Sequence, residues 1–171
     1  MYKSITIALL LFLCACGGTA SIDRFYEDHK EDDQVLAFRV SPVMFSMLRG
    51  LTGEMESLLG DTRDLRFIRL PANGNSGIPA LNRQVAELTA GSFIEIFRKN
   101  DGADRNLVAI RERGNSVREI LVFGNRATHG SLLYIRGDFS PAQVRNLAKE
   151  EAFGNLEERL TGAFGPATDI P

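Results

Sequence analysis

Apolar residues recur along this chain with two different periods, every three to four positions in some stretches and every second position in others. Residues 35–40 and 65–70 are short β-rich runs, which predicts two strands. After each of these runs, apolar residues recur every three to four positions, which predicts a helix. Residues 43–59 carry one apolar face after the first run, and Pro79 opens a second helix that Gly91 ends. The first half of the chain therefore predicts two βα units.

From Phe93 onward the period changes to two. Four β-rich runs follow, separated by Gly- and Asn-rich segments with the chemistry of hairpin turns. They are residues 93–98, 106–112, 117–123 and 131–136. This spacing predicts an antiparallel meander. For residues 93–98 the pattern leaves a second interpretation open, an extension of the preceding helix.

The meander runs are apolar on both faces. One predicted face carries Ile94, Ile96, Val108, Ile110, Ile120, Val122, Leu133 and Ile135. The other carries Phe93, Phe97, Leu107, Ala109, Leu121, Phe123, Leu132 and Tyr134. A sheet covered on one side alternates more cleanly between apolar and polar residues. We therefore expect helices on one face and a cover over at least part of the other.

The C-terminal part is predicted as a helix followed by a tail. Ser140 and Pro141 place an N-cap residue and a proline at the start of a helix. Residues 154–171 form a tail with weak helical spacing, which folds onto the open sheet face or docks elsewhere. The predicted fold class is α+β: two βα units, an antiparallel meander and a C-terminal helix, in a single sheet with helices packed on it. We place this domain at residues 34–153.

The N-terminus has the pattern of an export signal. Lys3 precedes an apolar run at residues 5–13, which is too short to span a bilayer of roughly 20 apolar residues. Leu13, Ala15 and Cys16 resemble the lipobox of bacterial lipoproteins, whereas an ordinary signal ends in an A-x-A-like site. We therefore predict a lipoprotein signal peptide at residues 1–15.

In the lipoprotein pattern, Cys16 becomes the first residue of the mature chain and carries the lipid. Two or more acyl chains anchor a protein stably in a membrane, so the membrane is an expected partner through Cys16. Residues 16–33 are predicted to be a charged tether, in which Ile22 and Phe25 also allow a short helix that leans on the domain. Gly17 stands where many inner-membrane lipoproteins carry Asp, so the outer membrane is favoured by analogy.

Composition excludes several classes of function. Twenty Lys and Arg residues stand against 22 Asp and Glu residues in a chain of 171, so no basic face for nucleic acid is expected. Both cysteines, Cys14 and Cys16, lie in the signal region, so the mature domain has no disulfide and no cysteine-based metal site.

No motif in the sequence names a reaction. The two histidines are His29, placed in the tether, and His129, placed in a turn, and neither has a second His or Cys at ligand spacing. Asp64 is one of four aspartates placed near turns. Residues 136–138 read Arg-Gly-Asp, which we interpret as an ordinary turn. We expect no enzyme, no cofactor and no metal.

Three stretches resemble a known family: VLAFRVSPVMFSML, FIEIFRKNDG and VREILVFG followed by SLLYIRGDFS. They are similar to the DUF-4252-type family of uncharacterised bacterial envelope lipoproteins, common in Bacteroidetes. The resemblance implies an outer-membrane or periplasmic lipoprotein with a role in envelope signalling. It carries over one functional position, Cys16.

The sequence thus favours a non-catalytic, lipid-anchored envelope protein that binds a protein or peptide partner through an uncovered sheet face or an edge strand. Two alternatives stay open, a carrier of a small hydrophobic ligand and an unidentified hydrolase. A partner-binding protein predicts exposed apolar surface. A carrier predicts an enclosed apolar cavity, and a hydrolase predicts a cleft where carboxylates or a histidine converge.

Overall fold

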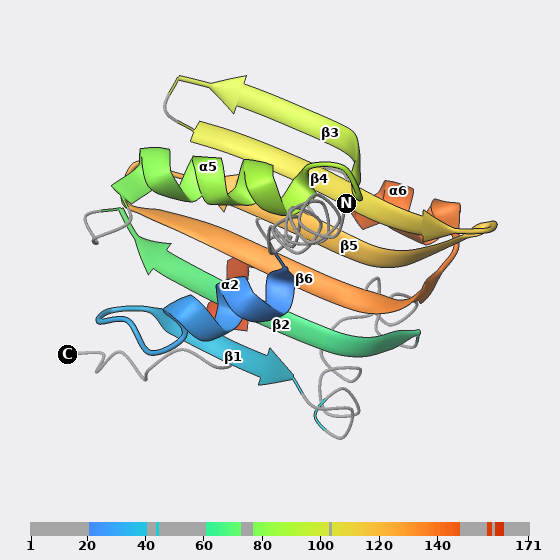
Figure 1. Ribbon diagram of the computed structural model, residues 1–171, viewed down its shortest axis with the longest axis horizontal. Coiled ribbons are helices and arrows are strands. Elements are labelled where there is room, and N and C mark those ends of the chain that lie inside the picture. The colour runs from blue at the N-terminus through green and yellow to red at the C-terminus, as the bar shows by residue number, and fades with distance from the viewer. Residues whose placement is uncertain are drawn as a thin grey trace, which may run out of the picture.

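The computed structural model describes residues 21–40, 44, 61–72, 77–102, 104–147, 157–158 and 160–162 (Figure 1). Its elements, in chain order, are α2 (Ile22–His29), β1 (Leu36–Val40), β2 (Thr62–Pro71), α5 (Gly77–Thr89), β3 (Ile94–Asp101), β4 (Asp104–Arg113), β5 (Ser116–Asn125), β6 (His129–Phe139) and α6 (Pro141–Leu147). Cys16 and most of the helix predicted over residues 43–59 lie outside the described residues.

The six strands form one antiparallel sheet in the order β1-β2-β6-β5-β4-β3. The last four strands of the chain are neighbours in this order, so the predicted meander is confirmed. Residues 94–101 are a strand, which decides against the helical extension. The α+β fold class is therefore confirmed.

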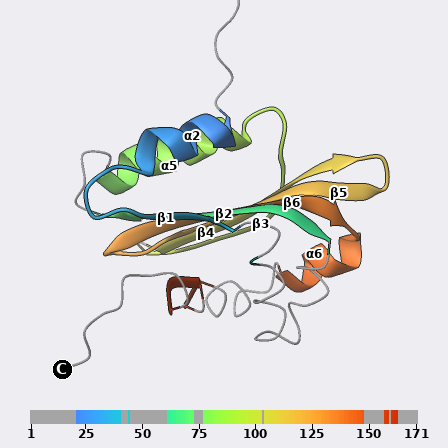
Figure 2. The same cartoon turned by 90° about the horizontal axis from the view of Figure 1, so that it is seen from below.

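Helices cover both faces of the sheet. Figure 2 shows α2 and α5 on one face and α6 on the other, beneath the sheet in that view. We call these the α2/α5 face and the α6 face. Leu160, near the C-terminus, is buried in the cluster on the α6 face, so part of the predicted tail also covers that face. The expectation that both faces are covered is confirmed.

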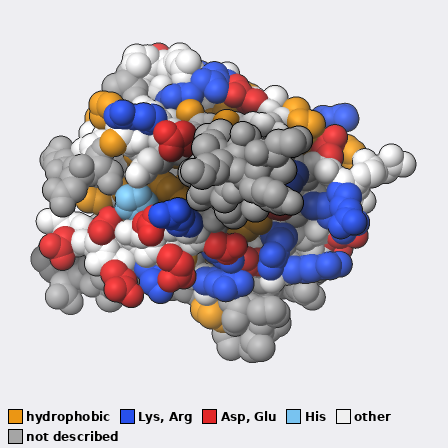
Figure 3. Space-filling view, viewed as in Figure 1, with side chains coloured by type: hydrophobic (Ala, Val, Ile, Leu, Met, Phe, Trp, Pro, Cys, Tyr) orange, Lys and Arg blue, Asp and Glu red, His pale blue; other side chains and the backbone are white. Residues whose placement is uncertain are grey.

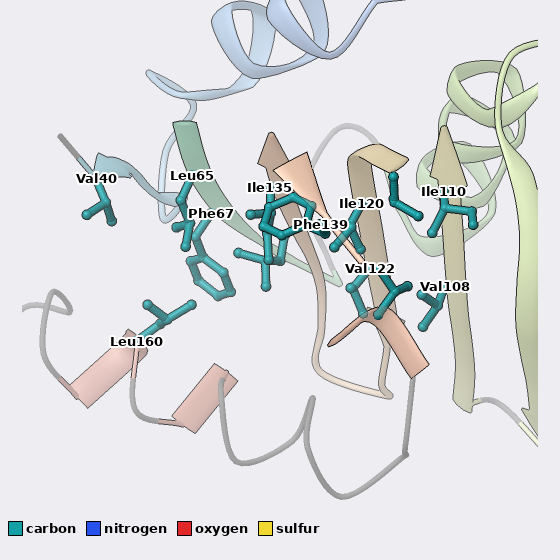
Figure 4. Packing of buried hydrophobic residues seen from close by; sticks show 13 residues of the cluster. Val40, Leu65, Phe67, Val108, Ile110, Ile120, Val122, Ile135, Phe139 and Leu160 are labelled. Carbon is teal, nitrogen blue, oxygen red and sulfur yellow. The ribbon is translucent and has the colours of Figure 1, made fainter. Parts of the chain in front are cut away.

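Alternation along the strands divides the core into two clusters. The cluster on the α2/α5 face contains Ile22, Phe25, Ile68, Leu70, Leu81, Val85, Leu88, Leu107, Leu121, Phe123, Leu132 and Tyr134. The cluster on the α6 face, drawn in Figure 4, contains Val40, Leu65, Phe67, Val108, Ile110, Val117, Ile120, Val122, Leu133, Ile135, Phe139, Val144 and Leu160. In the three inner meander strands, β4 to β6, this division follows the predicted faces.

Local sequence signals place the ends of the elements. Ser140 Oγ accepts from the backbone N–H of Gln143, and Gln143 Oε1 accepts from the N–H of Ser140, which is a capping box at the start of α6. Gly102 and Gly114 have φ angles of +59° and +65° in the hairpin turns. Such angles strain residues with a side chain, so the glycines fix these turns.

Residues 22–29, inside the stretch predicted as a tether, form α2. Ser21 caps the helix by accepting from the N–H of Arg24 at 3.2 Å. Ile22 and Phe25 are buried against the sheet, so the helix that the spacing allowed is present and packs on the domain. Packed structure thus begins no later than Ile22.

Candidate functional site

β3 is the outer strand at one end of the sheet, at the top of Figure 1. In the described part of the chain it pairs with β4 and with no other strand. Ile94 and Ile96 are 54% and 41% exposed, and they are the large apolar side chains that stand exposed among the described residues. An edge strand presents a row of backbone N–H and C=O groups that can pair with another chain.

A β-bulge interrupts the pairing of β3 with β4. Glu95 lies opposite Ala109 and Phe97 opposite Val108, so Ile96 has no partner in the register. The extra residue turns every following side chain to the other face. Phe97 consequently packs on the α6 face.

The predicted placement of Phe97 was therefore wrong. Phe97 lies on the face opposite to Phe93, because the bulge reverses the alternation between them. Ile94 lies opposite Ile110, on the face predicted for it, and Ile96 lies in the bulge. Both side chains are exposed, because β3 is the outermost strand.

Charged side chains accompany the exposed isoleucines. Arg98 donates two hydrogen bonds to the carboxylate of Glu95. These bonds hold the pKa of Glu95 below its usual range, so the carboxylate is charged at neutral pH. At the start of the strand, the guanidinium of Arg111 lies 4.5 Å from the centre of the Phe93 ring.

A second cluster surrounds Asp64 on β2, whose side chain is 2% exposed. Arg39 Nε donates to Asp64 Oδ1 at 2.7 Å, and Arg66 Nη2 lies 2.9 Å from Asp64 Oδ2. Arg136 Nη2 lies at 3.8 Å from the same oxygen. A buried carboxylate is stable only when cations compensate it, and here β1, β2 and β6 supply them. Asp64 was predicted near a turn, and it is the third residue of β2, three positions after the turn residue Asp61.

Arg66 extends this cluster to α2. It also donates to Asp23, and its guanidinium lies 5.8 Å from the ring of Tyr26 and 5.9 Å from that of Tyr134. At the surface of the α2/α5 face, Figure 3 shows basic side chains interleaved with acidic ones. We interpret the cluster as the electrostatic link between α2 and the sheet.

A third cluster lies at the start of β6, on the α6 face. His129 Nε2 lies 3.0 Å from Glu157 Oε1, and the Ser131 hydroxyl donates to the same oxygen. In a Ser–His catalytic pair, the serine hydroxyl donates its hydrogen bond to a histidine nitrogen. Here the hydroxyl of Ser131 donates instead to the carboxylate of Glu157. The arrangement connects the C-terminal segment to the sheet. His129 was predicted in a turn, but it is the first residue of a strand.

The remaining candidates also have structural roles. His29 is buried in α2 and contacts Asp32 at 2.9 Å and Gln84 at 3.2 Å. The Arg-Gly-Asp tripeptide lies within β6, so its interpretation as a turn was wrong. Gly137 stands there because a Cβ would lie 2.3 Å from the backbone oxygen of Asp61.

A family model described as a domain of unknown function, DUF4252, matches residues 26–147, which is more than half of the chain. The chain belongs to the DUF4252 family. No curated protein and no solved structure matches it.

The DUF4252 match runs from within α2 to the last residue of α6. It includes the β3 edge and the Asp64 cluster. Cys16 and Glu157 lie outside it. Within the described residues of this DUF4252 protein, no group of three His, Cys, Asp or Glu side chains is placed to hold a metal ion. In the same residues, no helix is long and apolar enough to cross a membrane.

Sequence reasoning missed the Asp64 cluster, although a signal for it exists. Asp64 and Arg66 are two positions apart in one strand, so they share a face, which is otherwise apolar at Ile68 and Leu70. Charged residues on a buried strand face need partners from neighbouring strands.

Proposed function

We propose that this DUF4252 protein is a non-catalytic, lipid-anchored protein of the bacterial envelope that binds a protein or peptide partner along the β3 edge. The anchor is the lipid on Cys16, and the outer membrane of a Bacteroidetes-type envelope is the favoured location. A role in envelope signalling follows from such binding.

The exposed edge of β3 carries the proposal. Peptide recognition by strand addition uses backbone hydrogen bonds for affinity and side chains at alternate positions for specificity. Natural edge strands are usually short, charged or covered. β3 has eight residues and exposes two isoleucines, Ile94 and Ile96. A docked strand would bury apolar surface of these side chains, which favours binding.

The position of α2 is consistent with an anchor at Cys16. Ser21 is five positions beyond Cys16 and caps the first helix on the α2/α5 face. A tether of this length reaches at most ~18 Å. An anchored chain would therefore keep its α2/α5 face close to the membrane and leave the β3 edge at the side of the sheet.

Photo-crosslinking in a bacterium that makes the full chain tests the binding edge. A photoreactive amino acid replaces Ile96 in one variant and Ala86, exposed on α5, in a control. We expect a discrete crosslinked species from position 96 that is absent from position 86 and disappears when Ile94→Lys is added. Equal crosslinking from both positions would contradict the proposal.

Intact mass and membrane fractionation test the anchor independently. The full-length chain is compared with Cys16→Ala. We expect a lipid-sized mass gain on a chain that begins at Cys16, and loss of both the gain and the membrane association in the variant. An unmodified chain that stays out of the membrane fraction in both cases would refute the anchor.

A further inference from the structure

We propose that the occupant of the β3 edge is β3 of a second copy, paired antiparallel so that Glu95 of each copy lies opposite Arg98 of the other. This inference rests on the proposed function and deepens it by naming the partner. It predicts a two-fold dimer with a continuous sheet of twelve strands, six from each copy.

The faces of the β3 side chains select this register. Glu95 and Arg98 lie opposite Ala109 and Leu107, so both point to the α2/α5 face. Ile94 and Lys99 lie opposite Ile110 and Asn106, on the α6 face. Directly opposed residues of antiparallel strands share a face. The proposed register satisfies this rule for Glu95 with Arg98 and for Ile94 with Lys99.

Neighbouring registers do not satisfy the rule. A shift by one residue places Glu95 opposite Phe97 or Lys99, both of which lie on the other face of the sheet because of the bulge. The bulge at Ile96 thus excludes the registers shifted by one residue. In the proposed register the exposed Ile96 of each copy meets Phe97 of the other.

The charges of β3 favour its own copy over foreign strands. Charged side chains and bulges normally protect an edge from pairing. In the proposed register, however, each carboxylate of Glu95 lies between its own Arg98 and Arg98 of the second copy, so charges alternate across the two-fold axis. The features that repel an unrelated strand become complementary in the dimer, which is how an interface gains specificity.

Antiparallel pairing also agrees with an anchor at Cys16. The two-fold axis of such a dimer is perpendicular to the sheet, so both copies present the α2/α5 face on the same side. α2, whose N-cap Ser21 lies five positions after Cys16, is on that face in each copy, as Figure 2 shows for one copy. Two lipid anchors can therefore enter one membrane. Parallel pairing of the same edges would turn one copy over and place its anchor on the opposite side.

Disulfide trapping tests the register in the full-length chain. Copies carrying Glu95→Cys and Arg98→Cys, with different tags, are made in one bacterium and their membranes are oxidised. Opposed positions lie ~5 Å apart between Cα atoms, within disulfide range. We expect a disulfide-linked heterodimer, and none when the second copy carries Ala86→Cys in place of Arg98→Cys. Equal yields from both combinations, or no product from either, would overturn the proposal.

Charge reversal in trans tests the same contact without a covalent bond. Glu95→Arg gives a copy with cations at both positions 95 and 98. Arg98→Glu gives a copy with anions at both positions. Each variant alone should sediment as a monomer in detergent, and an equimolar mixture should regain the dimer of the unmodified chain. The pair within one chain cannot be restored by mixing, so recovery reports contact between copies. A mixture that stays monomeric while the unmodified chain dimerises would exclude this contact.

The failure of this inference is distinguishable from failure of the proposed function. A crosslink from position 96 to a different protein, without the disulfide between copies, would refute the dimer and leave the binding edge intact. Absence of both products would refute the dimer and the binding edge together.

Discussion

At the scale of single residues, Asp64 connects three strands through its side chain. Its carboxylate is almost fully buried and is shared by arginines of three strands. Removing one member of a buried ion pair leaves the other charge buried without a partner. The resulting loss of folding stability is larger than the net stability that the intact pair contributes. We therefore interpret Asp64 as a structural residue of the α2/α5 face.

We expect Asp64→Asn to lower the free energy of unfolding by about 2–3 kcal/mol, less than for a fully buried pair because Arg39 and Arg136 are half-exposed. Urea unfolding in a Cys16→Ala background measures the change. The matched control is Asp138→Asn, whose side chain is 43% exposed and pairs with the 36% exposed Arg118, so the expected change is below about 1 kcal/mol. Equal effects of the two substitutions would contradict this role of Asp64.

Tyr134 gives the domain a dependence on alkaline pH. Burial raises the pKa of its phenol above the ordinary value of 10.0, and the negative charge of Glu119 and a hydrogen bond to it raise the pKa further. The unfolded chain ionises this phenol at a lower pH than the folded one. Stability contributed by Tyr134 is therefore fully present below pH 10 and decreases as the pH rises above it.

Tyr134→Phe removes the phenol, and therefore removes the part of the decrease in stability at alkaline pH that comes from its ionisation. We expect the free energy of unfolding to fall less between pH 8 and pH 11 in the variant than in the unmodified domain. Urea unfolding at both pH values measures the difference. A loss of the same size in both proteins would show that Tyr134 does not titrate in this way.

Residues with long-range partners were the hardest to place from the sequence. His129 and Asp64 resemble turn residues locally, because glycine or polar residues surround them. Their burial depends on Glu157 and Arg39, which lie 28 and 25 positions away in the sequence. Patterns within a short window carry no information on such pairings.

At the scale of elements, local signals were sufficient to predict the existence of the strands and the meander of the last four, but not the place of β2 beside β6. Alternation marked the strands, Ser140 marked the start of α6, and Gly102 and Gly114 marked the turns. The bulge in β3 escaped detection because Ile96 is an ordinary strand residue. The bulge becomes visible only when β3 is paired with β4.

Deletion of Ile96 tests the bulge. Without this residue, Glu95 and Phe97 become neighbours in a regular strand and every side chain keeps its present face. We expect a folded protein whose free energy of unfolding changes by less than about 1 kcal/mol. Deletion of Ala109 from β4 is the control, because it turns Leu107 and Val108 to the wrong faces and should prevent folding. If thermal unfolding shows equal damage from both deletions, the bulge does not have the assigned geometry.

At the scale of the whole molecule, the fold separates two tasks. The apolar clusters on both faces hold the sheet, and the Asp64 and Glu157 clusters connect α2 and the C-terminal segment to it. The packed structure extends beyond the family match at both ends, through Ile22 and Leu160. Phe97 of β3 packs against the cluster on the α6 face, whereas the exposed Ile94 and Ile96 belong to neither cluster. The outer side of β3 is therefore available for a partner.

Amide hydrogen exchange along β3 is the most direct test of whether this edge binds a partner. The full chain is compared in isolated envelope membranes and as a dilute detergent-solubilised monomer, with β1 at the opposite end of the sheet as the internal reference. We predict that residues 94–101 exchange more slowly in the membranes than in the dilute monomer, while the exchange of residues 36–40 is unchanged. Equally fast exchange of β3 in both samples would contradict the claim that this edge binds a partner.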